Sequence, residues 1–165
     1  MGSVASIAAI AARRDGNPAR INIDIKAPGA VVPLWETIRR HAAYDRVCVG
    51  SFGERRLHAF RRLAGARVAT AAGQLGTAAL RYAPGRLSTL AHSPGQVLQI
   101  PTTHEVRGRT FPLVTPGLIA AAHRFGLQVH VWTIDDPDDA EALVTAGVTG
   151  IITDVPDVIS DALAA

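Results

Sequence analysis

The chain has 165 residues, of which 48% are hydrophobic and 19% are charged, and its formal net charge is +3. This length and apolar share suit one domain with a hydrophobic core, and they exclude a disordered tail, a collagen-like fibre and a disulfide-stapled miniprotein. The one cysteine, Cys48, cannot form a disulfide within the chain, so we expect a reducing, cytoplasmic compartment.

The basic residues are almost all arginine, and Lys26 is the one lysine. A pI of about 9.7 is compatible with nucleic-acid binding. However, the arginine pairs at 39/40, 55/56 and 61/62 fall on predicted helix surfaces, and no aromatic residues are interleaved with them. We therefore interpret them as solvated outer faces and expect no nucleic-acid partner.

The N-terminal segment Met1–Ala12 is apolar, but it has no basic region before it, and Arg13 and Arg14 come after it. A signal peptide has the opposite order, so we predict none. No stretch approaches the roughly 18 consecutive apolar residues of a membrane span, so we expect no transmembrane segment.

Short strand-like runs alternate with helical patterns along the chain, and the strand centres lie about 20 to 32 residues apart. This rhythm is typical of the βα repeat of a parallel sheet, because each parallel strand needs a long crossover. The sequence therefore predicts an α/β fold. The predicted strands are Ile21–Lys26, Arg46–Ser51, Arg67–Thr70, Val97–Pro101, Gln128–Ile134 and Gly150–Asp154.

The helix in the second βα unit has both a start and a stop signal. Residues 51–54, Ser-Phe-Gly-Glu, predict a capping box in which the Ser51 hydroxyl accepts from the Glu54 backbone N–H and the Glu54 carboxylate reaches back. Gly65 is expected to end that helix with a positive φ. The segment 82–96, rich in Gly, Pro and Ser, is the predicted long loop.

Two later helices have equally clear signals. Thr115-Pro116 opens one, with proline at the first helical position, and Gly126 closes it. Asp136-Pro137 opens the next, and Gly147 closes it. No linker divides the sequence, so we expect a single domain over residues 1–165.

The first predicted strand has two very different faces. Its three isoleucines lie on one face, and Asn22, Asp24 and Lys26 lie on the other. A parallel strand covered on both sides should be almost continuously apolar. Two interpretations stay open: a structural Asp24–Lys26 ion pair or a water-facing edge strand, or a ligand or metal site at the carboxyl ends of the strands. The single lysine slightly favours the second.

The strand at 128–134 places His130 and Trp132 on one face, opposite its valines. Trp132 would then lie near the carboxyl end of the strand, although ordinary core packing is an equal alternative. The same alternation directs Gln99 and Ser51 towards that end, and for Ser51 a helix cap is already a sufficient role.

The remaining histidines have no metal-ligand spacing, and the sequence has no glycine-rich phosphate loop and no cysteine cluster. We predict that these histidines are surface residues. They are His41, His58, His92, His104 and His123.

Four segments resemble the glycerophosphodiester phosphodiesterase family. Residues 129–137 and 146–157 resemble its C-terminal signature. Residues 21–26, Ile-Asn-Ile-Asp-Ile-Lys, resemble the family's third barrel strand, usually written Asn-(Ile/Leu)-Glu-(Ile/Leu)-Lys. Residues 46–52, which run into Ser-Phe, are similar to its fourth strand. The match follows the family's order along the whole chain.

The resemblance implies an incomplete TIM (β/α)8 barrel of about six βα units, strands three to eight, without the first two strands. It implies metal-dependent hydrolysis of glycerophosphodiesters to glycerol 3-phosphate and an alcohol. By position, Asp24 corresponds to a ligand of the divalent cation, calcium or magnesium, and Lys26 to the catalytic lysine that faces the phosphate. Trp132 corresponds to the aromatic residue that lines the substrate mouth, where we also expect Ser51 and Gln99 to bind substrate.

The family's catalytic histidines lie in a His-Arg-Gly and a later His-Asp, and two further metal ligands lie in a Glu-x-Asp. None of these motifs occurs in the chain. We therefore expect impaired activity and a weakly bound cation, because hard cations need several oxygen ligands. The alternative is a non-catalytic remnant that binds a phosphate or a partner. Open barrel edges would favour a homo-oligomer.

Overall fold

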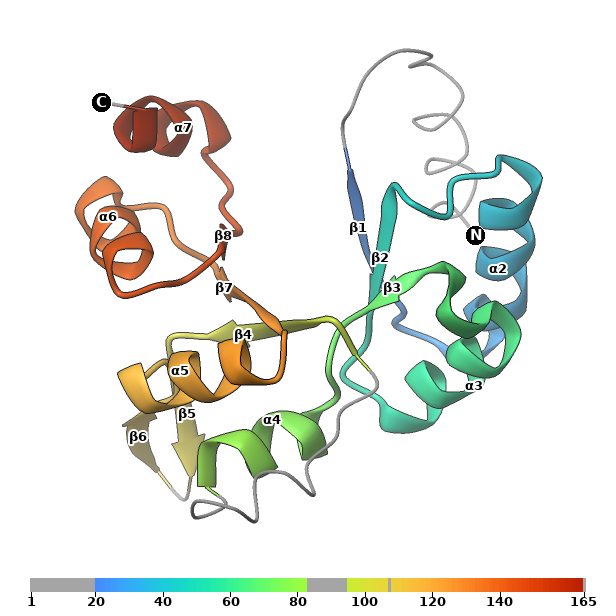
Figure 1. The fold of residues 1–165 in the computed structure, drawn as a ribbon, viewed down its shortest axis with the longest axis horizontal. Coiled ribbons are helices and arrows are strands. Elements are labelled where there is room, and N and C mark those ends of the chain that lie inside the picture. The colour runs from blue at the N-terminus through green and yellow to red at the C-terminus, as the bar shows by residue number, and fades with distance from the viewer. Residues whose placement is uncertain (1–19, 83–94, 107, 165) are drawn as a thin grey trace. The chain divides into compact units, whose positions relative to one another are not determined.

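The structure is a computed structural model that describes residues 20–82, 95–106 and 108–164. The chain divides into two compact units with the boundary between Leu75 and Gly76 (Figure 1). The apolar segment Met1–Ala12 and His92 lie outside the described residues, as do positions 83–94 of the predicted loop. Among the helices that the structure describes, none has the length and apolarity to cross a bilayer.

The first unit is built on a parallel sheet in the order β1-β2-β3. In its register Ile23 pairs with Val49, and Cys48 pairs with Ala69. Each connection carries a helix, as the βα rhythm predicts. The elements are β1 (Ile21–Asp24), a 3-10 turn (Pro28–Ala30), α2 (Val31–Arg40), β2 (Val47–Gly50), α3 (Glu54–Ala64), a 3-10 turn (Gly65–Arg67), β3 (Ala69–Thr70) and α4 (Gln74–Tyr82), which runs on into the second unit.

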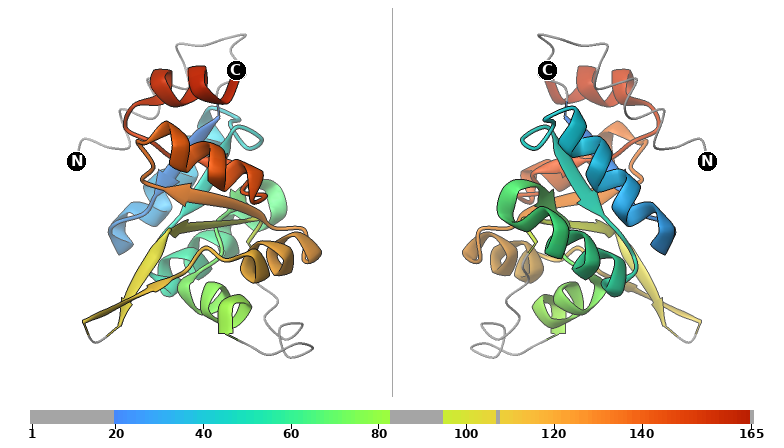
Figure 2. Two further views of the ribbon diagram at one scale, coloured as in Figure 1. Left: turned by 90° about the vertical axis from the view of Figure 1, so that its left-hand side faces the viewer. Right: turned by 90° about the vertical axis from the view of Figure 1, so that its right-hand side faces the viewer.

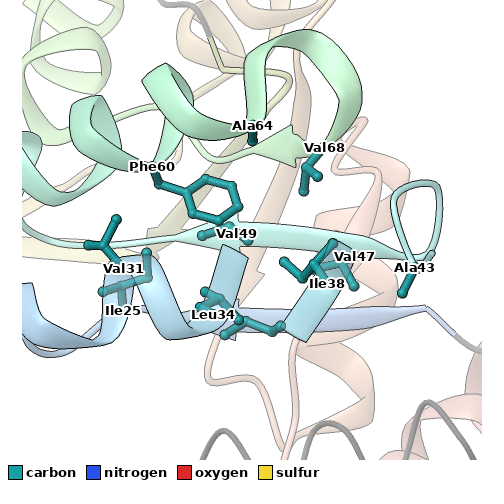
Figure 3. Packing of buried hydrophobic residues seen from close by; sticks show 11 residues of the cluster. Ile25, Val31, Leu34, Ile38, Ala43, Val47, Val49, Phe60, Ala64 and Val68 are labelled. Carbon is teal, nitrogen blue, oxygen red and sulfur yellow. The ribbon is translucent and has the colours of Figure 1, made fainter. Parts of the chain in front are cut away.

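The core of the first unit lies between this sheet and helices α2 and α3 (Figure 3). Leu34 and Ile38 recur on the buried side of α2 at a spacing of four, which is the period of one helix face. Phe60 of α3 is fully buried, and its ring meets Trp35 edge-on, with centroids 6.4 Å apart. Ile23 of β1 and Ile25, which directly follows the strand, belong to this core, and the partly buried Ile21 packs against it. The alternation predicted for the first strand is confirmed.

The predicted capping box is wrong. Helix α3 begins after Gly53, and no side chain caps it. The Ser51 hydroxyl accepts from the Gly53 backbone N–H instead of that of Glu54. The Glu54 carboxylate turns away and accepts from the backbone N–H of Leu75, 2.8 Å away, in the first turn of α4. Contacts between elements thus replace the local cap, while Gly65 ends α3 with a φ of 61° as predicted.

The second unit has a parallel sheet in the order β4-β7-β8, and all six predicted strands exist in the two parallel sheets. Their ends are mostly shorter than predicted, and Arg67 closes a 3-10 turn instead of opening β3. The elements are β4 (Val97–Pro101), β5 (Thr103–Val106), β6 (Arg109–Pro112), α5 (Pro116–Arg124), β7 (Gln128–Trp132), α6 (Pro137–Thr145), β8 (Gly150–Ile151) and α7 (Pro156–Ala164).

The predicted caps of the second unit are confirmed. Thr115 accepts from the backbone N–H of Leu118 at the start of α5. Asp136 accepts from two backbone N–H groups in the first turn of α6, at 2.9 and 3.1 Å. Gly126 and Gly147 follow these helices with φ of 71° and 100°, a region that favours glycine.

The sequence did not predict the antiparallel hairpin of β5 and β6. It leaves the carboxyl end of β4, and its described side chains are exposed. Backbone N–H groups of Leu113 and Val114 donate to the carbonyl of Thr102 and close its base. Figure 2 shows the hairpin extending away from α5 and α6 of its own unit.

Candidate functional site

Asp24 and Lys26 lie at the carboxyl end of β1 and form an ion pair, in which the Lys26 ammonium donates to Asp24 Oδ2. Strand alternation puts both side chains on the face opposite the buried isoleucines. The Lys26 side chain is 76% exposed, so the ammonium stays open to water and to a ligand. Lys26 Nζ also lies 5.4 Å from the ring centroid of Phe52, within the range of a cation–π contact.

Ser51 ties the ends of β1 and β2 together. Its hydroxyl donates to the carbonyl oxygen of Ile25 at 2.7 Å. Ser51 Oγ also accepts hydrogen bonds from the Gly53 backbone N–H at 3.2 Å and from Arg56 Nε at 2.8 Å. A hydroxyl has one proton and two lone pairs, so these three partners use its full capacity. Ser51 therefore links the ends of β1 and β2 to α3, and its role in substrate binding stays a prediction.

The arginine pairs of α3 are not uniformly solvated. Arg55 and Arg62 are exposed, but Arg56 and Arg61 turn inward. Arg61 donates to Thr70 Oγ1 at 2.9 Å and to the Ala71 carbonyl at 2.6 Å. Burial lowers the pKa of the Arg61 guanidinium, and the nearby Glu54 carboxylate opposes that shift. The sequence could not reveal this division, because both members of each pair are the same residue type.

In the second unit, His130 and Trp132 share the face of β7 opposite the buried valines, as predicted. His130 pairs in register with Gln99 of β4 and with Gly150 of β8, so these three residues form a row across the sheet. Gln99, His130 and Trp132 are half-buried. Trp132 is the last residue of β7, which places it at the carboxyl end of its strand.

The ring of His130 fills the space above Gly150. A Cβ added to Gly150 would lie 2.5 Å from a ring carbon of His130, far inside van der Waals contact. His130 Nε2 lies 3.2 Å from Gln128 Oε1. Burial lowers the pKa of His130 below its usual value, so the imidazole is neutral at pH 7. The row therefore offers neutral polar groups and an aromatic ring, and no charge.

The Thr-Asp part of the C-terminal signature also has a structural role. Asp135 Oδ1 accepts from the Thr153 hydroxyl at 2.8 Å and from the Asp154 backbone N–H at 2.9 Å. These bonds join the segments that follow β7 and β8. They fix the loops at the carboxyl ends of both strands, next to Trp132.

The described residues do not by themselves fit a divalent cation. Within them, no three His, Cys, Asp or Glu side chains gather closely enough to hold a metal ion. Asp24 is the one carboxylate of the predicted site, and its Oδ2 already faces the Lys26 ammonium. A hard cation needs several oxygen ligands, so Asp24 alone cannot bind it firmly.

The predicted site residues divide between the two units. Asp24, Lys26 and Ser51 lie together in the first unit, and Gln99 and Trp132 lie in the second. The histidines predicted to be surface residues are exposed at the four described positions. Cys48 is half-buried, and burial raises the pKa of its thiol to about 11, so it is a poor nucleophile.

The comparison with family models decides the relationship. The model described as "Glycerophosphoryl diester phosphodiesterase family" matches residues 23–158, most of the chain. The chain belongs to this family. Glycerophosphodiester phosphodiesterases have a TIM-barrel-like fold and are typically metal-dependent, and the parallel βα units of this chain agree with that fold.

Two curated relatives support the assignment. "Probable glycerophosphodiester phosphodiesterase 2" from Mycobacterium tuberculosis is 39% identical over 88% of this chain and 55% of its own length. A glycerophosphodiester phosphodiesterase from Caldanaerobacter subterraneus is 26% identical over 83% of this chain and 52% of its own length. The chain thus spans about half the length of these relatives.

Solved structures show the same fold. An Oleispira antarctica phosphodiesterase in complex with the product sn-glycerol-3-phosphate has a TM-score of 0.67 and 18% identity, over 90% of this chain and 56% of its own. A glycerophosphodiester phosphodiesterase from Agrobacterium tumefaciens has a TM-score of 0.63 and 19% identity, over 96% of this chain and 60% of its own.

Proposed function

We propose that this chain supplies strands three to eight of a glycerophosphodiester phosphodiesterase barrel and takes part in hydrolysing glycerophosphodiesters to glycerol 3-phosphate and an alcohol. The observation that carries the proposal is the exposed Lys26 ammonium, held by Asp24 at the carboxyl end of β1 within the family match. In TIM barrels, this end of the strands is where substrates bind. In this proposal both units belong to one domain.

Lys26 binds the phosphodiester and stabilises the charge that develops on it. Its ammonium donates to a non-bridging phosphoryl oxygen, which gains negative charge when a nucleophile attacks phosphorus. A donor aimed at that oxygen lowers the barrier because it interacts more strongly with the transition state than with the substrate. Asp24 keeps the ammonium in place until the phosphate arrives.

Trp132 and Gln99 serve substrate binding on the second unit. Trp132 presents a half-buried ring at the end of β7, which suits packing against the glycerol or the head group. Gln99, which pairs in register with His130, contributes a neutral amide. Ser51 acts indirectly, through the carbonyl of Ile25.

The acid–base histidines must come from residues beyond this sequence, because their motifs do not occur in it. The same holds for the further ligands of a calcium or magnesium ion, to which Asp24 would add one carboxylate. We therefore assign no catalytic step to the cation. We expect little or no turnover from this chain without those residues, since acid–base catalysis contributes about 10²–10⁴-fold.

The alternative function is binding without turnover, and the absence of a metal-binding group among the described residues favours it. In that case the chain binds glycerol 3-phosphate or a glycerophosphodiester through Lys26. Calorimetric titration with glycerol 3-phosphate separates the two functions, because binding that persists while every turnover assay stays negative supports the alternative.

The test is complementation. The part of the Mycobacterium tuberculosis relative that this chain does not cover is co-expressed with the chain, and glycerol 3-phosphate release from glycerophosphocholine is measured with calcium or magnesium. We expect release only from the pair, and its loss with Lys26→Ala or Asp24→Ala. Arg55→Ala, an exposed cation on α3, is the matched control and should retain activity. Robust turnover by the chain alone would contradict the proposal.

We also propose a cytoplasmic location and a homo-oligomer. The single cysteine supports the first. The second rests on the outer strands of the proposed partial barrel, β1 and β8, which can pair with another chain. Light scattering during size-exclusion chromatography tests the oligomer, and a monomeric mass would contradict it.

A further inference from the structure

Arg56 is a half-buried arginine in the first turn of α3, next to the candidate site. Its Nε donates to the Ser51 hydroxyl at 2.8 Å. Arg55, its neighbour in sequence, is exposed and has the same side chain. The two arginines therefore differ in what they contact and not in their chemistry.

The guanidinium group of Arg56 occupies space that is open because residue 53 is a glycine. A Cβ on Gly53 would lie 2.6 Å from the guanidinium carbon of Arg56 and 2.8 Å from one of its Nη atoms. Any other residue at position 53 would push Arg56 away from Ser51. The missing side chain of Gly53 thus provides the space in which the Arg56–Ser51 hydrogen bond forms.

Ser51 links Arg56 to the end of β1 through its hydroxyl group. Its hydroxyl donates to the Ile25 carbonyl, and the Ile25 backbone N–H donates to the Gly50 carbonyl at 2.9 Å. Both polar groups of Ile25 are therefore fixed by β2 and the residue that follows it. Ile25 stands between Asp24 and Lys26, so its fixed backbone sets the starting point of both side chains of the ion pair.

We infer that Arg56 is a positioning residue for the candidate phosphate site: through Ser51 and the carbonyl of Ile25, it holds Lys26 in the place where it meets the phosphate. A charged donor makes a stronger hydrogen bond than a neutral one, which suits a side chain that must orient a hydroxyl. The inference rests on the proposed function only for the identity of the ligand. The effect on Lys26 itself is independent of turnover.

The chain offers a direct readout, because Lys26 is its one lysine. Growth with ¹³C,¹⁵N-lysine gives a single lysine spin system in NMR spectra. The ammonium lies over the Phe52 ring, so the ring current makes the Hε signals of Lys26 sensitive to small displacements. Lys26→Arg identifies the signals by removing them.

The decisive comparison is between Arg56→Met and the matched control Arg55→Met, which removes the same charge one residue away. We expect Arg56→Met to shift the Lys26 Hε signals towards random-coil values and to weaken inorganic phosphate binding about tenfold, as lost orientation worth about 1.4 kcal/mol would do. Arg55→Met should leave the signals in place. Equal spectra for the two variants would overturn the inference.

Two further variants keep the test sharp. Ser51→Ala should shift the Lys26 signals in the same way, and the double variant Ser51→Ala/Arg56→Met should add nothing, because both act through one hydroxyl. Additive shifts would overturn the inference. Near-wild-type Trp35 fluorescence, measured in a Trp132→Phe background, shows that each variant is folded, and Arg56→Gln replaces Arg56→Met if that variant is not folded. If the Lys26 signals of the wild-type chain do not shift when phosphate or glycerol 3-phosphate is added, the proposed function is contradicted. The effect of Arg56 on Lys26 is not.

Discussion

The two units place different chemistry at the ends of similar strands. In the first unit, the polar face of β1 ends in the charged pair Asp24 and Lys26, with the Lys26 side chain 76% exposed. In the second, the corresponding face of β7 carries the neutral, half-buried His130 and Trp132. A charged side chain at a strand end has a small desolvation cost only when water or an oppositely charged partner reaches it. The first unit therefore presents charged side chains at its strand end, and the second presents neutral, half-buried ones.

The largest effect we predict is on the core of the first unit. Phe60→Ala should lower the free energy of unfolding by about 3–5 kcal/mol, because it leaves a cavity against Trp35 and the sheet. Each unit has one tryptophan, so urea unfolding is followed by Trp35 fluorescence in a Trp132→Phe background and by Trp132 in a Trp35→Phe background. Leu63→Ala, partly exposed on the same helix, is the control. A loss below about 1 kcal/mol would contradict the prediction.

A second variant addresses the row of neutral residues in the other sheet. Gly150→Ala should destabilise the second unit by about 1–3 kcal/mol, because the added methyl group collides with the His130 ring. The control is Gly117→Ala in α5, where nothing lies within 4 Å and where alanine should stabilise the helix by about 0.5–1 kcal/mol. Trp132 fluorescence reports both. If both variants had the same stability, His130 would not occupy the space above Gly150.

Much of the second unit was predictable, because its signals are local. Thr115 and Asp136 cap their helices through bonds within three residues, and the glycines that follow need only a positive φ. The first unit was harder, because Ser51 and Glu54 take partners from other elements. The alternation of β1 brought Asp24 and Lys26 to one face correctly. The hairpin of β5 and β6 was missed because it buries no apolar face and so leaves no periodic pattern.

Removing one of these local signals should have a moderate effect. Asp136→Ala should cost about 1 kcal/mol of unfolding free energy, because two backbone N–H groups at the start of α6 lose their acceptor. Asp161→Ala removes an exposed carboxylate from α7 and is the control. Urea unfolding monitored at Trp132 measures both. A change equal to that of Asp161→Ala would show that the cap does not limit stability.

The smallest predicted effect is a pH dependence confined to the second unit. Burial lowers the pKa of His130 in the folded state below the 6.5 of the unfolded chain, so the unfolded chain binds more protons in that window. Stability should therefore fall as the pH drops below about 6.5 and level off below the folded pKa. His130→Gln should remove this part of the slope at Trp132 and leave the Trp35 transition unchanged. An identical slope in the variant would contradict the prediction.

The carboxylate of Glu54 has a consequence for protein engineering. It occupies the space that Gly73 leaves open, where an added Cβ would meet it, and it caps the first turn of α4 through Leu75. The start of α4 therefore belongs to the first unit, and the rest of α4 belongs to the second. A fragment that stops before Gln74 removes the Leu75 backbone N–H that donates to this carboxylate, whereas one that retains α4 keeps that hydrogen bond. Designs that divide, permute or fuse this chain should place their junction after α4.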